Sequence, residues 1–217
     1  MSIERPHIIV TAGPTHEPID PVRYIANRSS GKQGFAIAAA LAAKGARVTL
    51  IAGPVTLDTP PGVTRVDVQT AREMAVAVEA ALPADVAIMV AAVADWRVEE
   101  ASQKIKKDSG GALRTLTLVE NPDILAALAR SPRRPRLLIG FAAETENIIA
   151  NAQTKLARKG CDLIIANDVS GPINESVMGG TANTVHIVTA TGVESWERMA
   201  KDEVAEKLAV RVLATRM

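Results

Sequence analysis

The 217-residue sequence has little of what several classes of protein need. A single cysteine excludes a disulfide within the chain. A net charge of +1 and only five aromatic residues argue against a nucleic-acid surface, which is usually basic and often carries stacking rings. No apolar run reaches membrane-spanning length, and the first residues, MSIERP, lack the apolar core of a signal peptide. We therefore expect a cytoplasmic protein that binds small molecules and neither nucleic acid nor a membrane.

Familiar phosphate and metal motifs are also missing. Neither G-x-G-x-x-G nor G-x-x-x-x-G-K-[ST] occurs, and Gly31–Gly34 is only a fragment of either. His7, His16 and His186 show no metal-ligand spacing, which argues against a dedicated zinc site. Cys161 stands between a helix stop and an apolar run, with no histidine nearby in sequence. We interpret it as a small buried hydrophobe rather than a nucleophile.

The stretch that is present and unusual is Thr11–Gly34, which follows the first apolar run, His7–Val10. We predict a long loop, after which an alanine-rich segment from Phe35 onward forms a helix whose first N–H groups lack intrahelical partners. Its glycines allow close backbone approach and its serines offer hydroxyls: Gly13, Gly31, Gly34, Ser29 and Ser30. A phosphate site and a structural turn explain these residues equally well. The length of about twenty residues favours a functional loop.

Strands and helices are expected to alternate along the rest of the chain. The expected strands are His7–Val10, Arg47–Ala52, Thr64–Val68, Val86–Ala92, Leu137–Ala142, Asp162–Ala166 and Thr184–Thr189. The expected helices are Phe35–Lys44, Ala71–Leu82, Asp123–Arg130, Asn147–Lys159 and Asp202–Thr215, with Thr70 and Asn121 as N-caps. This alternation predicts an α/β fold, with a doubly wound, mostly parallel sheet and a small C-terminal β-hairpin and helix extension. We expect one domain over residues 1–217.

A polar, glycine-terminated segment at about residues 99–119 interrupts this rhythm and predicts a mobile flap with an edge strand at Leu113–Val119. It contains K-I-K-K at 104–107, which by itself favours a solvated charge run. Lys155 and Lys159, four residues apart on one helix, repel each other unless an anion lies between them. Favourable placement of cations near a helix C-terminus explains this pair equally well.

Ligands of doubly wound sheets bind at the carboxyl ends of the strands. The segments that follow the expected strands carry Gly13, Asp95, Phe141 with Glu144, and Asn167 with Asp168. We expect these groups to converge beside Thr11–Gly34 and to form a crevice for a nucleotide.

Six ordered blocks of the sequence resemble the phosphopantothenoylcysteine synthetase family, the phosphopantothenate–cysteine ligases of coenzyme A biosynthesis. The blocks are residues 11–38, AAVADW at 91–96, KIKK at 104–107, NPDI at 121–124, GFAAET at 140–145 and DLIIANDV at 162–169. The resemblance extends from about residue 6 to the C-terminus and implies a Rossmann-like fold. It is weakest at Val177–Asn183, where the family more often has an acidic, Asn-rich loop, and we assign no role there.

The resemblance implies a magnesium-dependent ligase that uses CTP. The carboxylate of 4'-phosphopantothenate attacks the α-phosphate, pyrophosphate leaves, and the amine of L-cysteine displaces CMP from the acyl cytidylate. In bacteria the ligase is commonly the C-terminal half of a bifunctional flavoprotein whose other half decarboxylates the product. No such half precedes Met1, so we expect a stand-alone enzyme or an excised domain. Family precedent implies a homodimer.

The resemblance also assigns individual residues. It places the triphosphate on Gly13, Ser29, Ser30 and Gly31, and the cytidine among Ala91, Asp95, Asn121, Pro122 and Phe141. It makes Lys104, Lys155 and Lys159 phosphate ligands, with Lys104 on a flap that closes over the intermediate. Asn27 is suited to donate a hydrogen bond to the acyl oxygen and Arg23 to orient the pantothenate carboxylate or phosphate, so the predicted catalytic residues are Asn27, Arg23 and Lys104. Metal ligands and a general base are not assigned.

Two other interpretations compete with the ligase. A short-chain nicotinamide oxidoreductase predicts a glycine fingerprint and a Tyr-x-x-x-Lys, yet the only tyrosine, Tyr24, is followed by Arg28. A non-catalytic nucleotide- or flavin-binding half of a flavoprotein explains the fold but not the set of Lys104, Lys155 and Lys159.

Overall fold

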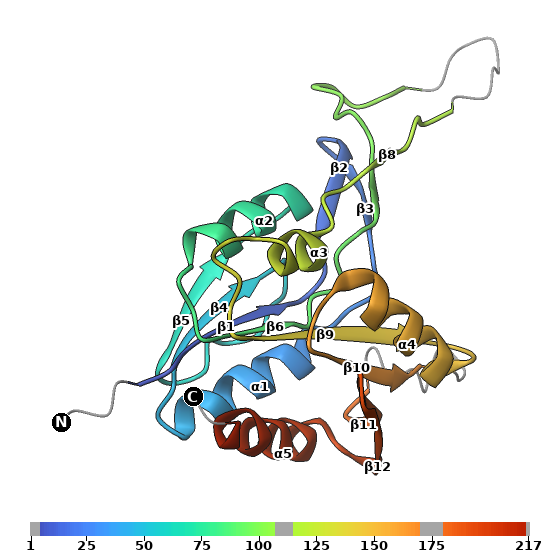
Figure 1. Ribbon diagram of the computed structural model, residues 1–217. Coiled ribbons are helices and arrows are strands. Elements are labelled where there is room, and N and C mark those ends of the chain that lie inside the picture. Colours follow the sequence, from blue (N-terminus) through green and yellow to red (C-terminus); the bar gives the residue numbers. More distant parts are fainter. Residues whose placement is uncertain (1–4, 107–114, 170–179, 216–217) are drawn as a thin grey trace.

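The computed structural model describes residues 5–106, 115–169 and 180–215 (Figure 1). Its main sheet consists of β1 (His7–Ala12), β4 (Arg47–Ala52), β5 (Val63–Asp67), β6 (Val86–Met89), β9 (Leu137–Glu144), β10 (Leu163–Asp168), β11 (Ala182–Thr189) and β12 (Gly192–Ala200). The spatial order is β12-β11-β10-β9-β6-β1-β4-β5. The strands β5, β4, β1, β6, β9 and β10 are parallel to one another. Strand β11 is antiparallel to its neighbour β10, and β12 is antiparallel to β11.

This strand order is that of a doubly wound nucleotide-binding sheet, in which the direction of winding reverses between β1 and β6. The expected α/β class is therefore confirmed. The C-terminal hairpin extends the parallel part by β11 and β12. The sequence predicted this hairpin but gave no bounds for its second strand, which the structure places at Gly192–Ala200 with Trp196 buried.

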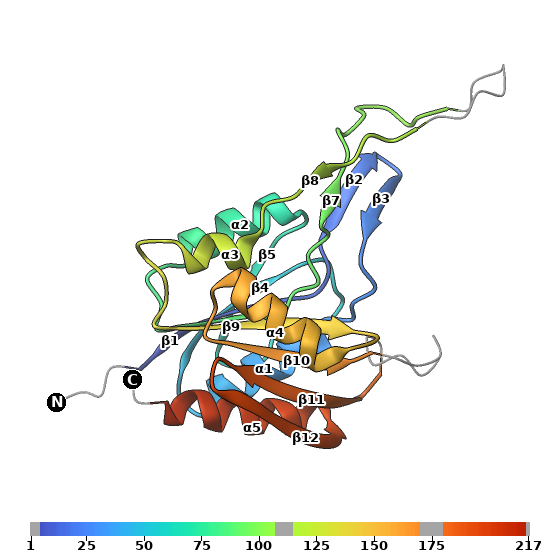
Figure 2. The same ribbon diagram turned by 45° about the vertical axis from the view of Figure 1, so that its right-hand side comes forward.

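Helices cover both faces of the sheet (Figures 1 and 2). One face carries α1 (Lys32–Ala43) and α5 (Lys201–Ala214), and the other carries α2 (Ala71–Ala80), α3 (Ile124–Ala129) and α4 (Ile148–Lys159). Successive side chains of a strand point to opposite faces, so Ile8 and Val10 join the core below α1 and α5 while Ile9 joins the other core. The inward residues expected for α5 are buried: Val204, Ala205, Leu208 and Val212. Within the described part of the chain, no helix is long and apolar enough to cross a membrane.

Helix starts differ in how well the sequence indicated them. Thr70 caps α2 as expected, because its hydroxyl accepts a hydrogen bond from the Glu73 N–H at 3.2 Å. The cap expected at Asn121 for α3 is wrong. Asp123 occupies that position and accepts from the Ala126 N–H at 3.1 Å. Asn121 instead donates its side-chain amide to the Ala94 carbonyl, which leaves it available to shape the site described below.

The expectation of one continuous loop over Thr11–Gly34 is wrong. A hairpin of β2 (His16–Asp20) and β3 (Arg23–Ala26) lies in its middle. Its turn forms because the Asp20 carboxylate accepts hydrogen bonds from the N–H groups of Val22 (2.9 Å) and Arg23 (3.0 Å). The glycine and serine groups therefore flank a hairpin instead of sharing a loop.

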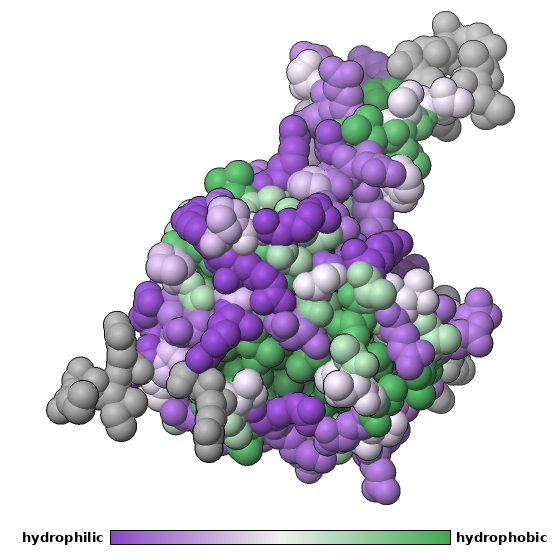
Figure 3. All heavy atoms as spheres, in the orientation of Figure 1, coloured by the Kyte–Doolittle hydropathy of each residue, from purple (hydrophilic) through white to green (hydrophobic). Residues whose placement is uncertain are grey.

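The hairpin belongs to an arm, which we define as residues 16–26, 96–106 and 115–120. The arm also contains β7 (Trp96–Arg97) and β8 (Val119–Glu120), and it projects away from the main sheet (Figure 2). The edge strand expected at Leu113–Val119 is reduced to β8 in the described part, and residues 107–114 of the expected flap lie outside it. Figure 3 shows a hydrophobic patch on the arm. The large hydrophobic residues exposed on the arm are Val22, Tyr24, Trp96, Leu116, Leu118 and Val119.

Candidate active site

A cleft of about 920 Å³ lies at the carboxyl ends of β1, β6, β9 and β10. This is where a doubly wound sheet places its ligand, at the point where the strand order reverses. The volume suits a nucleotide-sized molecule. Nearly all the residues that the sequence assigned to a site line this cleft: Gly13, Asn27, Ser29, Ser30, Gly31, Ala91, Asp95, Asn121, Pro122, Phe141, Lys155 and Lys159.

One end of the cleft is built to hold an anion. Gly13 (φ 77°) and Gly31 (φ 74°) both adopt the left-handed conformation, and a Cβ at Gly31 would lie 3.4 Å from the Gly13 Cα. Both glycines therefore hold a backbone conformation that residues with a side chain rarely adopt. Gly31 precedes α1, whose N-terminus has no side-chain cap and no acidic residue in its first turn. Its N–H groups and the helix dipole favour negative charge here.

A second glycine feature brings α1 onto the sheet. A Cβ at Gly34 would lie 2.5 Å from the Cβ of Ala12, at the end of β1. Such a distance is far below a normal contact between carbon atoms. Only glycine at this position lets the start of α1 lie directly against β1, which places the helix N-terminus at the mouth of the cleft.

The other end of the cleft is formed by two segments tied together by hydrogen bonds. The side-chain amide of Asn121 donates to the Ala94 carbonyl at 2.9 Å, and the Asn121 N–H donates to the Asp95 carbonyl at 2.9 Å. Arg97 donates to the Asn121 side-chain oxygen at 3.4 Å. Asp95 is exposed, so its carboxylate is an accessible acceptor for hydroxyl groups of a ligand.

Asn27 lies against the wall of the cleft. Its side-chain nitrogen donates to the carbonyls of Val93 (3.0 Å) and Ala92 (3.4 Å). Because both neighbours are acceptors, the amide group has only one sensible orientation. The segment after β6 thereby holds Asn27 beside the centre of the cleft.

The two lysines of α4 both line the cleft, but they have different partners. Lys155 lines the cleft, and burial lowers its pKa, although Glu144 and Asp95 act in the opposite direction. Lys159 forms an ion pair with Asp123 at the start of α3. Burial alone would raise the pKa of Asp123, but the hydrogen bonds from Lys159 and the Ala126 N–H outweigh it and lower that pKa. Lys155 is thus the lysine of this pair that faces the cleft without a hydrogen-bonded carboxylate.

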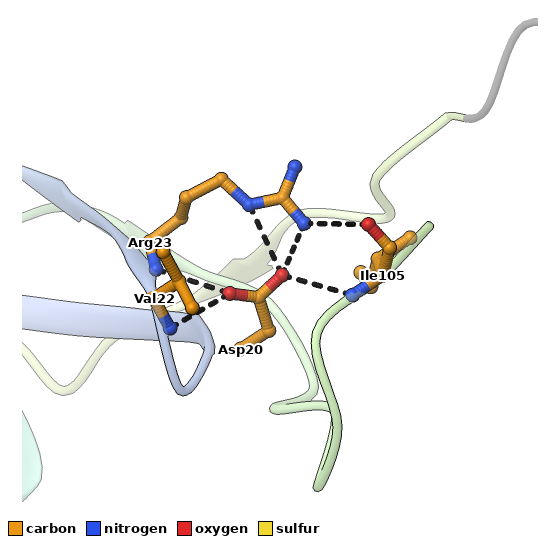
Figure 4. Close-up of polar contacts among 4 residues, drawn as sticks. All are labelled: Asp20, Val22, Arg23 and Ile105. Carbon is orange, nitrogen blue, oxygen red and sulfur yellow. Dashed lines mark hydrogen bonds and ion pairs between the residues drawn. The ribbon is translucent and has the colours of Figure 1, made fainter. Parts of the chain in front are cut away.

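Arg23 and Lys104, two of the predicted catalytic residues, do not line the cleft of their own chain. The Arg23 guanidinium pairs with the Asp20 carboxylate and donates to the Ile105 carbonyl at 3.1 Å (Figure 4). The Ile105 N–H donates to the same carboxylate at 3.1 Å. The hydrogen bond from Arg23 holds the pKa of Asp20 well below its usual range. Asp20 therefore joins the hairpin to the segment that carries Lys104, both on the arm.

Sequence reasoning missed several polar residues that line the cleft, among them Lys32, Gln33, Asn183 and Lys201. Of these, Gln33, Asn183 and Lys201 are buried, and two of the three come from the C-terminal extension. One signal was available. Lys201 begins a helix, where acidic residues are favoured and a lysine is disfavoured by the helix dipole.

The chain matches the family described as DNA/pantothenate metabolism flavoprotein C-terminal domain over residues 3–215. It is 54% identical over 169 residues to the coenzyme A biosynthesis bifunctional protein CoaBC of Escherichia coli (strain K12), which covers 76% of this chain and 42% of that protein. The protein of the same name from Haemophilus influenzae is 46% identical over 209 residues, covering 95% of this chain and 51% of the relative. The chain thus spans about half the length of these relatives or less.

A solved structure, the C-terminal domain of a CoaBC protein, superposes with a TM-score of 0.79 at 37% identity, covering 95% of this chain and 93% of the other. The DNA/pantothenate metabolism flavoprotein from Streptococcus pneumoniae has the same fold, with a TM-score of 0.80 at 23% identity, covering 97% of this chain and 100% of the other. The resemblance inferred from the six sequence blocks is therefore confirmed. Because the family match runs over almost the whole chain, the protein belongs to the DNA/pantothenate metabolism flavoprotein C-terminal domain family.

Proposed function

We propose that this chain is a phosphopantothenate–cysteine ligase that joins 4'-phosphopantothenate and L-cysteine into 4'-phosphopantothenoylcysteine at the expense of CTP. The observation that carries the proposal is the convergence, in one cleft, of an uncapped helix N-terminus, Lys155 and the Asn27 side chain. Activating a carboxylate with a nucleotide brings two anions together, which requires positive charge at the phosphates. Relatives named for coenzyme A biosynthesis support the same chemistry.

In the first step a carboxylate oxygen of 4'-phosphopantothenate bonds to the α-phosphorus, and the bond to the β-phosphate oxygen breaks. The backbone around Gly13 and Gly31 and the start of α1 hold the triphosphate, while Lys155 offsets its charge. In the second step the cysteine nitrogen bonds to the acyl carbon, CMP leaves, and one proton is lost from the amine. The Asn27 amide, which donates to the Val93 and Ala92 carbonyls in the free protein, turns to donate to the acyl oxygen as that oxygen becomes negative.

We assign the nucleoside to the end formed by Asp95, Asn121, Pro122 and Phe141. The Asp95 carboxylate accepts from ribose hydroxyls, and the bonded pair of Ala94 and Asn121 forms a rigid wall for the base. Backbone N–H and carbonyl groups recognise a base by the fixed positions of their donors and acceptors. The preference for CTP therefore depends on which of these groups the wall formed by Ala94 and Asn121 presents to the base.

Magnesium fits this donor set only together with the nucleotide. In the described residues, no group of three His, Cys, Asp or Glu side chains lies where it would hold a metal. Magnesium usually binds through substrate phosphates and one or two carboxylates and keeps several waters. Asp95 and the buried side-chain oxygens of Asn167 and Asn183, which have no hydrogen-bond partner, provide oxygen acceptors for the ion or its waters. When bound, the ion neutralises charge on the triphosphate.

We also infer a homodimer formed through the arm. Val22, Tyr24 and Trp96 are 60%, 55% and 45% exposed there, and exposed apolar patches mark interaction sites. Arg23 and Lys104 lie on the arm and outside their own cleft. When a second copy docks at the arm, Arg23 meets the carboxylate of a substrate bound in the cleft of that copy. Lys104 keeps the role of phosphate ligand that the resemblance implies.

The test is to mix the protein with 4'-phosphopantothenate and magnesium, vary the nucleotide, and follow pyrophosphate before and after cysteine is added. We expect release with CTP and amide product only after cysteine. The absence of release with CTP would defeat the ligase proposal, and release with ATP alone would overturn the preference for cytosine. Binding of NADH with hydride transfer would instead favour the oxidoreductase.

A further inference from the structure

The end of the cleft on the α1 and α5 face contains two lysines. Lys32 begins α1, and Lys201 begins α5 and is only 6% exposed. Burial lowers the pKa of Lys201, and the nearby charge of Lys32 lowers it further. Neither lysine has a role in the function proposed above. Two like charges held together at the wall of a cavity destabilise each other, and a bound anion removes that repulsion.

Hydrogen bonds between distant parts of the chain position Lys201. The Gln33 side chain, in the first turn of α1, donates to the Lys201 carbonyl at 3.1 Å. The Asn183 side chain on β11 donates to the Gln33 side-chain oxygen at 3.2 Å, and the Lys201 N–H donates to the Thr181 carbonyl at 2.8 Å. Gln33 and Asn183 are buried. The C-terminal extension is therefore fixed against the helix N-terminus that faces the phosphate site.

A second observation at this end points to a ligand. The side-chain oxygens of Asn167 and Asn183 are buried and have no hydrogen-bond partner, and both residues line the cleft. Leaving a buried acceptor unsatisfied costs about 1–3 kcal/mol. Water molecules carried by the magnesium of a bound polyphosphate are donors of the kind that these oxygens need.

The position of Lys201 within the cleft indicates which part of the nucleotide it meets. The groups assigned to the nucleoside, Asn121 and Pro122, precede α3, and Lys155 belongs to α4; both helices cover one face of the sheet. Lys201 and Lys32 come from α1 and α5, which cover the other face. A nucleotide that crosses the edge of the sheet at Gly13 and Gly31 therefore presents its terminal phosphates to these lysines.

We propose that Lys201, together with Lys32, binds the two terminal phosphates of the nucleotide, which leave as pyrophosphate in the first step. The extension of β11, β12 and α5 thus completes the phosphate site and is not only a support for the sheet. This inference rests on the proposed function. Lys201 neutralises the leaving group, so its removal weakens binding of pyrophosphate and CTP but not of CMP.

The experiment measures binding by calorimetry, with magnesium present, for pyrophosphate, CTP, CMP and 4'-phosphopantothenate. The variants are Lys201→Gln, Lys201→Arg and, as a matched control on the same helix, Lys207→Gln, whose ammonium lies over the Trp196 ring instead of in the cleft. We expect Lys201→Gln to weaken pyrophosphate and CTP at least about tenfold, the usual scale for losing a hydrogen bond to a charged group. CMP binding stays within about twofold, Lys201→Arg retains most affinity, and the control matches the original protein.

Equal pyrophosphate affinity in Lys201→Gln and the original protein would overturn the inference. So would a loss confined to 4'-phosphopantothenate, because the site would then hold the other phosphate, and so would an equal loss for CTP and CMP, which would indicate a general effect on the cleft. Lys201→Met serves as a check on folding. Whatever the melting temperature of this variant without ligand, pyrophosphate is expected not to raise it, whereas pyrophosphate raises that of the Lys207→Gln control.

Failure of this inference and failure of the ligase proposal give different results. Pyrophosphate binding requires no turnover. Lys201-dependent binding in a protein that forms no amide would remove the ligase proposal and retain the phosphate site. Amide formation with pyrophosphate binding that does not depend on Lys201 would do the reverse.

Discussion

The phosphate end of the cleft and the arm differ in how their functional groups are held. At the phosphate end, Gly34 packs against Ala12 and a buried chain of hydrogen bonds through Gln33 joins α1 to the C-terminal extension. On the arm, the contacts that hold Arg23 among the described residues are those with Asp20 and Ile105, and apolar side chains of the arm are exposed. The contrast teaches that the phosphate end is fixed by buried contacts within the chain, whereas the arm leaves apolar side chains open to a partner, as the proposed dimer requires.

The largest effect is expected for the residue between these two regions. Asn27→Ala removes the amide held against Val93, and with it the donor at the reacting carbon. We expect the rate of amide formation to fall by about 10²–10³, while CTP binding is nearly unchanged. The measurement is single-turnover product formation together with nucleotide titration. Asn151→Ala, which removes an exposed asparagine of α4 outside the cleft, is the matched control. Full activity in Asn27→Ala would remove Asn27 from the mechanism.

A smaller loss is expected from the cleft lysine. Lys155→Met removes a cation whose pKa is lowered by burial and whose charged form a bound phosphate stabilises. Nucleotide affinity should fall by about 10–100-fold, corresponding to a lost hydrogen bond to a charged group. Titration with CTP measures the loss. Lys44→Met, at an ion pair with Glu206 away from the cleft, should leave affinity intact. If both variants bind alike, Lys155 is not a ligand.

The proposal that the arm forms the dimer interface is tested by substituting two exposed valines, one on the arm and one elsewhere. Val22 is 60% exposed on the arm and Val76 is 70% exposed on α2. If the arm forms the dimer interface, Val22→Ser raises the dimer dissociation constant by about tenfold, because burying one valine side chain contributes about 1.5 kcal/mol. Val76→Ser should change nothing. Sedimentation equilibrium distinguishes the two. The same dissociation constant for both variants would place the interface elsewhere.

The smallest effect concerns order within the arm. The pKa of Asp20 is lowered in the folded protein, so its contribution to stability is present above the ordinary value of 3.8 and is lost as pH falls below it. Protease cleavage near Ile105 should therefore increase as pH decreases through that range. Asp20→Asn should be cleaved readily even at pH 7 and show little further change. A cleavage rate that depends on pH equally in both proteins would show that Asp20 does not fasten the arm.

The sequence was most informative where a pattern repeats over neighbouring residues. The expected strand Arg47–Ala52 and the cap at Thr70 match the structure, because strand periodicity and capping depend on side chains a few residues apart. The sequence was less informative where a polar residue could either cap a helix or form another hydrogen bond. Asn121 has a good capping side chain, yet Asp123 two residues later caps α3, and local preference does not decide between them. The turn at Asp20 was missed because its hairpin is shorter than most strand patterns.

Composition and periodicity determined the α/β class, and the family resemblance supplied the groups proposed to bind phosphate. Only the tertiary structure decided which charges meet. Gln33 and Lys201 are 168 residues apart and share a hydrogen bond, while Arg23, only four residues from Asn27, lies outside the cleft that Asn27 lines. The physical reason is that burial and charge proximity depend on the packing of distant segments, and neighbours in sequence carry no information about that packing.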